Sequence, residues 1–284
     1  MSVKKRTAKE TALIKAVYDY YKKHGRHDLP WRPPSLALGR DKVTLDPYKI
    51  AVSEIMLQQT QVGRVIEKYK EFLKVFPTVQ TLANAPLSKV LALWSGLGYN
   101  RRAKFLHEMA KAVVQQKAFP KTVEELLTLP GVGTYTAGAI SVFAYNSPAV
   151  FIETNIRTVY LHHFFADKKN VPDKELLPYI EATLDCKNPR RWYWALMDYG
   201  SHLKSQGIHI HRNSKAYKKQ SAFKGSLREV RGGIIKILTH NHITAVQLQK
   251  HLSFEKEFIN KALQALLKEK LIEKKKSYYS ITEQ

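Results

Sequence analysis

The carboxylate of Glu153 follows the apolar run Val150-Phe151-Ile152 directly and precedes Thr154, Asn155 and Arg157. Taking a bare carboxylate out of water is unfavourable unless hydrogen bonds or a cation compensate for the lost hydration. Three arrangements would explain a carboxylate here: an ion pair with Arg157, a cap on the helix that begins at this point, or a chemical role. The residue types alone leave all three open.

A second segment, "LPGVGTYTAG" (129–138), places Gly131 and Gly133 around one apolar residue. Two glycines in this spacing allow a tight turn whose backbone N–H groups point outward beside a helix N-terminus, which is a natural phosphate site. We expect Thr134 to cap the second helix. The alternative is an ordinary turn between two helices.

The charge balance points to a polyanionic partner. The chain has 47 Lys and Arg against 24 Asp and Glu, a formal net charge of +23. Nucleic acid is the leading partner, with an anionic membrane surface second. No apolar run approaches the roughly 20 residues of a transmembrane helix, and residues 1–10 show no signal-peptide core. We therefore expect a soluble, cytoplasmic monomer, associated with the nucleoid if the source is bacterial.

Cys186 is the only cysteine. An internal disulfide is therefore excluded, and so is an iron–sulfur cluster held by several thiolates of this chain. We expect no bound metal.

The spacing of apolar residues predicts an all-α fold for roughly the first 220 residues. The expected helices cover 8–23, 48–76, 87–96, 101–116, 122–129, 134–145, 155–165, 174–184 and 190–203, with a loop bearing proline and glycine between the first two.

The C-terminal part has a different pattern. Three helices at 228–241, 244–253 and 255–270 precede an alternating segment at 271–282 that predicts two strands with lysines at their tip. This order predicts a winged helix-turn-helix, a small α+β domain whose third helix commonly enters a DNA groove. Glu255 and Glu257 at the start of that helix argue against base reading, and a protein-docking module remains the alternative. The expected domains are 1–215, a basic linker at 216–226, and 227–284.

Six segments occur together in an order typical of one protein family. They are "LPWR", "DPYKIAVSEIMLQQTQV", "FPTVQTLANAP", "LWSGLGYNRRAKFLHEMA", "LPGVGTYTAGAI" and "ETNIRTV". Residues 12–203 thereby resemble the MutY-type adenine DNA glycosylases of the helix-hairpin-helix endonuclease III superfamily. The resemblance implies a two-lobed helical fold with the active site between the lobes, and a double-stranded DNA substrate whose damaged or mispaired nucleotide is rotated out of the duplex.

The resemblance also implies catalytic roles. Glu54 matches the general acid that protonates the departing base, and apolar neighbours surround it in the sequence. Glu153 stands where the family carries an aspartate that stabilises a cationic sugar, and Asn155 matches an orienting asparagine. Tyr135 replaces the nucleophilic lysine of glycosylase/lyase relatives, so no Schiff base can form there. Helix packing is the alternative role for Tyr135.

Further residues match DNA-contacting positions of the family. The DNA-binding set is Gln58, Gln59, Tyr99, Arg101, Gly131, Gly133 and Thr134, and the base-pocket set is Leu29, Trp31, Arg32 and Trp194. Gln59 matches a residue that wedges into the gap left by the flipped base, and Tyr99 one that inserts beside the opposing base. Buried structural roles remain the alternative for both. Arg102 and Lys104 are expected to add phosphate contacts.

Three departures from the family bear on cofactor and substrate. The four cysteines of the family's cluster are missing from the segment after Gly200, where Lys204 is expected to supply phosphate contacts. Trp194 replaces the Glu or Gln that hydrogen-bonds adenine. The short C-terminal segment stands in place of the family's domain for 8-oxoguanine. A metal held by His202, His209 and His211, or a monovalent cation at the hairpin, remains an alternative to no cofactor.

We therefore expect a monofunctional base-excision DNA glycosylase that removes adenine mispaired with guanine or 8-oxoguanine. One alternative is removal of another base, such as uracil, thymine, hypoxanthine or an alkylated purine. A different alternative is a non-catalytic protein that binds distorted DNA.

Overall fold

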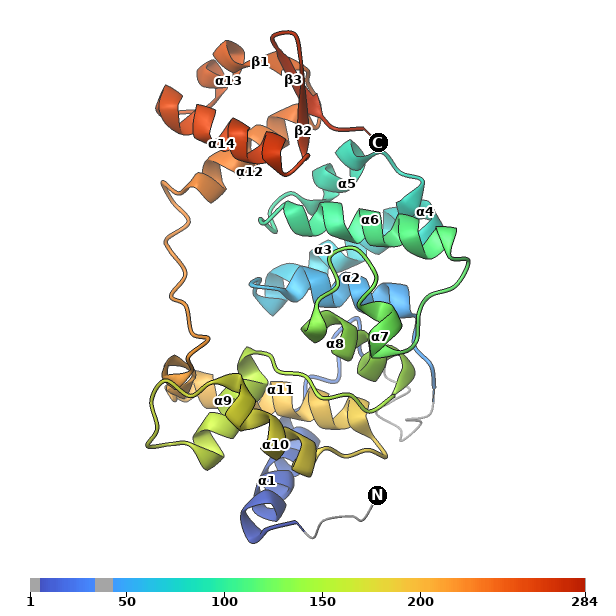
Figure 1. Ribbon diagram of the computed structural model, residues 1–284, viewed down its shortest axis with the longest axis vertical. Coiled ribbons are helices and arrows are strands. Elements are labelled where there is room, and N and C mark those ends of the chain that lie inside the picture. Colours follow the sequence, from blue (N-terminus) through green and yellow to red (C-terminus); the bar gives the residue numbers. More distant parts are fainter. Residues whose placement is uncertain (1–5, 34–42, 284) are drawn as a thin grey trace. The chain divides into compact units, whose positions relative to one another are not determined.

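The computed structural model describes residues 6–33 and 43–283, which are mainly helical (Figure 1). Part of the expected loop, 34–42, lies outside the described residues. The chain forms two compact units. The first comprises Met1–Ile50, Lys121–Leu127 and Gly133–Lys219, and the second comprises Ala51–Pro120, Thr128–Val132 and Gln220–Gln284.

The first unit is built around α11. Its helices are α1 (Ala8–His24), α7 (Val123–Leu126), α8 (Thr134–Tyr145), α9 (Thr154–Phe164), α10 (Asp173–Thr183) and α11 (Pro189–Ser205), followed by the short 3-10 helix η2 (Ile210–Asn213). Helix α11 packs along α9 and against α1. Helix α1 begins at a capping box formed by Thr7 and Glu10, and it buries Leu13, Val17 and Tyr21. The apolar stripe read from the sequence therefore faces the core.

The second unit contains most of α2 (Pro47–Leu57), together with α3 (Val62–Val75), α4 (Val79–Ala83), α5 (Leu87–Trp94) and α6 (Arg101–Gln115). Helix α6 packs against both α4 and α5, and α3 packs against α5. The core of this region includes Phe72 and Trp94, which are fully buried and meet edge to face at 6.2 Å.

The prediction of a single helix over 48–76 is wrong. The structure has two helices, because the chain breaks between Leu57 and Val62. Gln59, inside the break, adopts a left-handed backbone with φ of 55°. The local sequence has neither glycine nor proline at 58–61 to mark this break.

The C-terminal part of the second unit is a three-helix module with a small sheet (Figure 1). Its elements are α12 (Leu227–Leu238), β1 (Ile243–Thr244), α13 (Ala245–His251), α14 (Lys256–Lys268), β2 (Ile272–Lys275) and β3 (Tyr278–Ile281). The strands are antiparallel in the order β1-β3-β2, with Ile272 opposite Ile281. The sequence predicted β2 and β3 but not β1, whose two residues are too few to alternate. We call residues 227–283 the C-terminal module.

Two local predictions for this module are confirmed. Thr244 and Gln247 form a capping box at the start of α13. Ile259, Leu263 and Leu266 on one face of α14 are all buried. Among the helices in the described ranges, none combines the length and the apolar composition that crossing a membrane requires.

Candidate functional site

Glu153 caps helix α9. Its Oε1 accepts hydrogen bonds from the backbone N–H groups of Asn155 at 2.7 Å and Ile156 at 2.9 Å. Its Oε2 accepts a bond from Nδ2 of Asn155 at 3.2 Å. Arg157 instead pairs with Asp173, with two contacts of 2.7 Å, so the ion pair with Glu153 does not form. The half-buried carboxylate is thus fixed through Oε1, while Oε2 carries only the bond from Asn155 within the described chain.

The segment before Glu153 is held by one aromatic residue. Phe151 is buried and stacks on Tyr193 at 4.1 Å, and the Tyr193 hydroxyl donates to the carbonyl of Ala149 at 2.8 Å. Tyr135 on α8 meets the Phe151 ring edge to face at 5.8 Å. Val150 is 41% exposed, so the apolar run is not buried as a whole. Tyr135 and Glu153 are therefore brought near each other through Phe151.

Gly200 on α11 allows this helix to approach the start of α9. A Cβ atom at position 200 would lie 2.3 Å from the carbonyl oxygen of Asn155, so any side chain would displace the backbone beside Glu153. Gly200 is not among the functional residues expected from the sequence. Its signal was an isolated glycine inside a helical pattern, which often marks a close backbone approach.

Lys204, near the C-terminal end of α11, has an electrostatic link to Glu153. Burial lowers the pKa of the Lys204 ammonium group, and the negative charge of Glu153 opposes that shift only in part. The expected phosphate contact of Lys204 stays a prediction.

Glu54 is a buried carboxylate on α2, with only 4% of the residue exposed. Ile50, Ile55 and Met56 around it are at most 3% exposed. A solvated position on the helix surface is therefore excluded. Glu54 belongs to the second unit, whereas Glu153, Asn155 and Tyr135 belong to the first.

Gln59 and Tyr99 share an unusual backbone conformation in the second unit. Both have positive φ angles, 55° and 49°, although neither is glycine. Each such residue carries a conformational strain on the order of 1–3 kcal/mol that the surroundings must offset, and strain of this kind concentrates at functional sites. Gln58, the third predicted residue of this region, precedes Gln59 in the same break between α2 and α3.

Arg102 connects the two strained loops. Its guanidinium donates to the carbonyl groups of Ile55, Met56, Gln58, Leu97 and Gly98 and to the Thr60 hydroxyl, over distances of 2.5–3.1 Å. The carbonyl groups of Ile55 and Met56 lie in the last turn of α2, and that of Gln58 follows the helix beside Gln59. Those of Leu97 and Gly98 precede Tyr99. Burial lowers the pKa of Arg102 to about 10. The phosphate contact expected of Arg102 is wrong, because the side chain is buried and both terminal nitrogens of its guanidinium donate to protein oxygens.

We expect Arg102→Met to reduce the free energy of unfolding by roughly 3–5 kcal/mol, because it leaves buried carbonyl groups without donors. Urea denaturation of the full chain measures this change. The matched control is Arg101→Met, since Arg101 is exposed on the same turn of α6 and should change stability by no more than ~0.5 kcal/mol. Equal small losses in both variants would contradict the role of Arg102.

Residues of the C-terminal segment contact Gln59 and Tyr99. The side-chain amide of Gln220 donates to the Tyr99 hydroxyl and to Oε1 of Gln59, the latter at 3.4 Å. Arg228 donates to the same hydroxyl at 2.9 Å, and its guanidinium lies 5.3 Å from the centre of the Tyr99 ring. Arg102 lies 5.5 Å from that ring. No sequence signal pointed to Gln220 or Arg228, because residues far apart in the chain make these contacts.

The glycine turn matches its prediction in part. Gly131 has φ of +72°, and a Cβ atom there would collide with Phe105 at 2.4 Å, so this position requires glycine. Gly133 has an ordinary φ of −96° and is itself the N-cap of α8. Thr134 is the first residue inside the helix and makes no cap, so the predicted Thr134 cap is wrong. Arg101 lies over the Phe105 ring at 4.9 Å.

The predicted base-pocket residues all lie buried in the first unit. Leu29, Trp31, Arg32 and Trp194 are between 4% and 6% exposed. The guanidinium of Arg32 lies 5.2 Å from the Trp194 ring and binds both carboxylate oxygens of Asp198, at 2.8 and 3.0 Å. Trp194 also stacks on Phe143 at 5.8 Å. The structure thus brings Arg32 and Trp194 together.

Asp198, which the sequence analysis missed, is the centre of this cluster. Burial acts to raise the pKa of the Asp198 carboxyl group, but the guanidinium groups of Arg32 and Arg26 outweigh burial and hold the pKa below its ordinary value. The ion pairs therefore stabilise the fold at neutral pH, and this contribution is lost as the pH falls through the lowered pKa.

The donor groups present do not fit a four-cysteine cluster. The single cysteine, Cys186, is exposed, and the described residues hold no group of three or more His, Cys, Asp or Glu side chains arranged for a metal ion. The segment that follows α11 forms η2 and a parallel bridge instead: the N–H of Val171 donates to Asn213, and the N–H of Lys215 donates to Val171, both at 2.9 Å. Protein hydrogen bonds therefore hold this segment.

Comparison with known proteins shows what part of this chain is similar to. Residues 52–178 match the HhH-GPD superfamily base excision DNA repair protein model. An adenine DNA glycosylase of Buchnera aphidicola is 37% identical over 197 residues, which cover 67% of this chain and 53% of the relative. The adenine DNA glycosylase of Mycolicibacterium smegmatis is 42% identical over 48% of this chain and 44% of its own length. That of Homo sapiens is 41% identical over 54% of this chain and 28% of its own length. The chain thus spans about half the length or less of these relatives.

Two solved structures share the fold. A thermostable thymine-DNA glycosylase superposes with a TM-score of 0.57 at 26% identity, covering 68% of this chain and 86% of that one. A non-covalent endonuclease III–DNA complex superposes with a TM-score of 0.53 at 15% identity, covering 68% and 85%.

Proposed function

We propose that the protein is a DNA glycosylase, because residues 52–178 match the HhH-GPD superfamily base excision DNA repair protein model. It hydrolyses the N-glycosidic bond of a base rotated out of duplex DNA. The preferred substrate is adenine mispaired with guanine or 8-oxoguanine, which is supported by the identity of 37–42% to adenine DNA glycosylases.

The observation that carries the proposal is the anchored carboxylate of Glu153 with Asn155. In a glycosylase, departure of the base leaves positive charge on the sugar, and a fixed anion stabilises that charge. Glu54 donates the proton that the departing base takes, and water supplies the hydroxyl that replaces the base at the sugar. Burial of Glu54 and the cap that fixes Glu153 give the two carboxylates the different environments that these roles require.

The monofunctional reaction is supported by Tyr135. A phenol cannot form the Schiff base with the sugar that a lysine amine would form, so water completes the reaction. No iron–sulfur cluster takes part, since one cysteine cannot hold it. Phosphate binding at the hairpin needs no cation in this proposal, because the backbone N–H groups of the turn can themselves donate hydrogen bonds to a phosphate.

DNA binding involves Gln59, Tyr99 and the hairpin at Gly131. The left-handed backbone at Gln59 and Tyr99 supports wedging and insertion, because strain of this kind is characteristic of functional loops. Insertion of Tyr99 requires that its hydroxyl exchange the bonds from Gln220 and Arg228 for contacts with DNA. The proposed domain plan is a helix-hairpin-helix DNA glycosylase domain at 1–215, a basic linker at 216–226 and a winged-helix-like domain at 227–284. The helix and strand order of the C-terminal module supports the last of these.

Thymine is the second candidate base. The indole of Trp194 cannot make the paired hydrogen bonds of a carboxylate or carboxamide to adenine, and such bonds supply much of the selectivity of a polar pocket. The structural similarity to a thymine-DNA glycosylase, at 26% identity, favours this alternative over the others.

A panel of duplexes tests the proposal. Each duplex carries one candidate base opposite one defined base, and strand breaks are scored with and without alkali. We expect breaks for adenine opposite guanine or 8-oxoguanine, and only after alkali, because a monofunctional enzyme leaves the abasic strand intact. Alkali-dependent breaks only in duplexes that carry thymine at the target position would show that thymine, the second candidate, is the base removed. Binding without base release for any duplex would reject the glycosylase, and breaks without alkali would reject the monofunctional reaction.

A further inference from the structure

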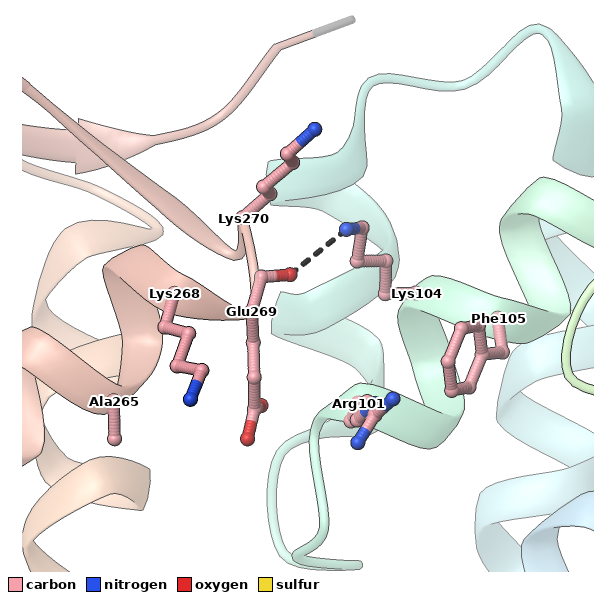
Figure 2. A pocket seen from close by; sticks show the side chains of 7 residues that line it. All are labelled: Arg101, Lys104, Phe105, Ala265, Lys268, Glu269 and Lys270. Carbon is pink, nitrogen blue, oxygen red and sulfur yellow. Dashed lines mark hydrogen bonds between the residues drawn. The ribbon is translucent and has the colours of Figure 1, made fainter.

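A cationic cavity lies where the C-terminal module meets α6. Its volume is about 460 Å³. Its lining includes Arg101, Lys104 and Phe105 of α6, and Lys268, Glu269 and Lys270 at the end of α14. Figure 2 shows the two groups facing the cavity from two sides. All six residues belong to the second unit.

The single carboxylate among these residues is already neutralised. Glu269 pairs with Arg231, which does not line the cavity, at 2.5 Å. The backbone carbonyl of Glu269 accepts a hydrogen bond from the Lys104 ammonium at 2.8 Å (Figure 2), and Glu108 lies 3.4 Å from that ammonium.

The remaining cations have no such partners. The charged ends of Arg101, Lys268 and Lys270 make no hydrogen bond or ion pair within the part of the chain that the structure describes. The cavity therefore holds an excess of positive charge with free donors, which suits an anion with several acceptor oxygens.

The C-terminal module is fixed against this region, so the cavity is preformed. The carboxylate of Glu283 accepts hydrogen bonds from the N–H groups of Leu87 and Ser88 at the start of α5, at 3.1 and 3.3 Å. The Lys104 ammonium group on α6 donates to the backbone carbonyl of Glu269. These contacts hold Lys268 and Lys270 close to Arg101 before any ligand arrives, and preorganisation of this kind reduces the entropy lost on binding.

The cavity adjoins residues proposed to contact DNA. Phe105 lines it and also packs against Gly131 of the hairpin turn. Arg101 lies two positions after Tyr99 in the chain. A backbone held at the hairpin and at Tyr99 therefore passes near the cavity.

We propose that this cavity binds a phosphate of the DNA backbone, so that Lys268 and Lys270 of the C-terminal module belong to the DNA-binding surface. This inference rests on the proposed function, because it takes DNA as the polyanion. In this proposal the C-terminal end of α14 contacts a DNA phosphate, and the helix does not enter a groove to contact bases. Contacts with phosphate fix the position of a protein on a duplex without reading its sequence.

The test compares two double variants of the full chain. Lys268→Gln/Lys270→Gln removes two charges from the cavity, and Lys236→Gln/Lys250→Gln removes two charges from exposed positions of α12 and α13 that do not line it. The dissociation constant for a duplex with a non-hydrolysable nucleotide at the target position is measured over a range of KCl concentrations. Urea denaturation establishes that both variants keep the stability of the wild type.

We expect the cavity variant to bind more weakly and to lower the slope of log Kd against log[KCl] by ~1, the value for one lost phosphate contact. The control should keep the wild-type slope. Equal changes in the two variants would show a general effect of charge and overturn the proposal, as would an unchanged slope in the cavity variant. A larger change in the control would place the contact elsewhere on the module.

Phosphate ethylation interference on the same duplex locates the contact. We expect one interfering phosphate in the wild type that no longer interferes in the cavity variant. The same phosphate interfering in both would overturn the proposal. Because the duplex is not hydrolysed, the outcome is separate from base release: a lowered slope with no base released by the wild type rejects the glycosylase alone, and base release with an unchanged slope rejects the cavity alone.

Discussion

Glu54→Gln is expected to lower the single-turnover rate of base release by about 10²–10⁴-fold, the contribution typical of a general acid. Glutamine has nearly the same shape as glutamate but has no acidic proton to give to the departing base. Only 4% of the residue is exposed, so little bulk water reaches it to act in its place. Single-turnover assays on the best duplex of the panel, with enzyme in excess, measure the rate without the contribution of product release.

The control for Glu54 is Glu67→Gln on α3. The Glu67 side chain is 71% exposed and pairs with the exposed Lys70, so its replacement should leave the rate unchanged. Urea denaturation of the Glu54 variant separates loss of the acid from loss of the fold. Base release at the wild-type rate in a folded Glu54→Gln protein would show that another group protonates the base.

Most helices could be predicted from the sequence because their signals are local. Apolar spacing located α1, α8 and α9 to within about two residues, and apolar spacing together with a capping box did the same for α13. The break at Gln59 could not be predicted in this way. The carbonyl groups that end α2 are satisfied by Arg102, more than forty positions further along the chain, and a helix that ends on a distant donor leaves no mark in its own sequence. Short-range reasoning therefore failed at a loop proposed to contact DNA, as expected where function imposes strain.

The candidate site was predicted unevenly for the same reason. The sequence left Glu153 with three explanations. The structure shows the cap, which is compatible with a chemical role, and excludes the ion pair with Arg157, because that arginine pairs with Asp173. The sequence also grouped Arg101 and Arg102 by charge. Their position on the helix decides their roles, since one points to solvent and the other into the core. The contacts of Gln220 and Arg228 depend on the tertiary fold and had no counterpart in the sequence pattern.

Because Glu153 caps α9, substitutions at this position can separate the effect of its negative charge on the rate from its effect on stability. Glu153→Gln retains an oxygen that can accept from the N–H groups of Asn155 and Ile156, so the α9 cap and the stability should largely persist. The negative charge that we propose acts on the sugar is lost, however. We expect the single-turnover rate to fall by about 10²-fold or more, since removal of one preorganised electrostatic contact in a site has an effect of that order.

Glu153→Asp keeps the charge and supplies a shorter side chain that is well suited to capping. The carboxylate moves by about 1 Å, and such a displacement can change the rate by as much as ~10²-fold. The rate falls if the carboxylate leaves its optimum position and rises if the carboxylate reaches it. If glutamate is the length for which this site is built, the aspartate variant loses rate but remains above the glutamine variant. If the site retains the geometry of its relatives, aspartate equals or exceeds the wild type.

Glu181→Gln on the exposed side of α10 serves as the neutral control in the first unit. A fall in rate for Glu153→Gln without a fall in the unfolding midpoint supports an electrostatic role. If the rate and the unfolding midpoint of Glu153→Gln fall together, Glu153 acts only as the cap of α9. An unchanged rate in both Glu153 variants would remove the residue from the reaction, because neither charge nor length would then matter to the step that breaks the glycosidic bond.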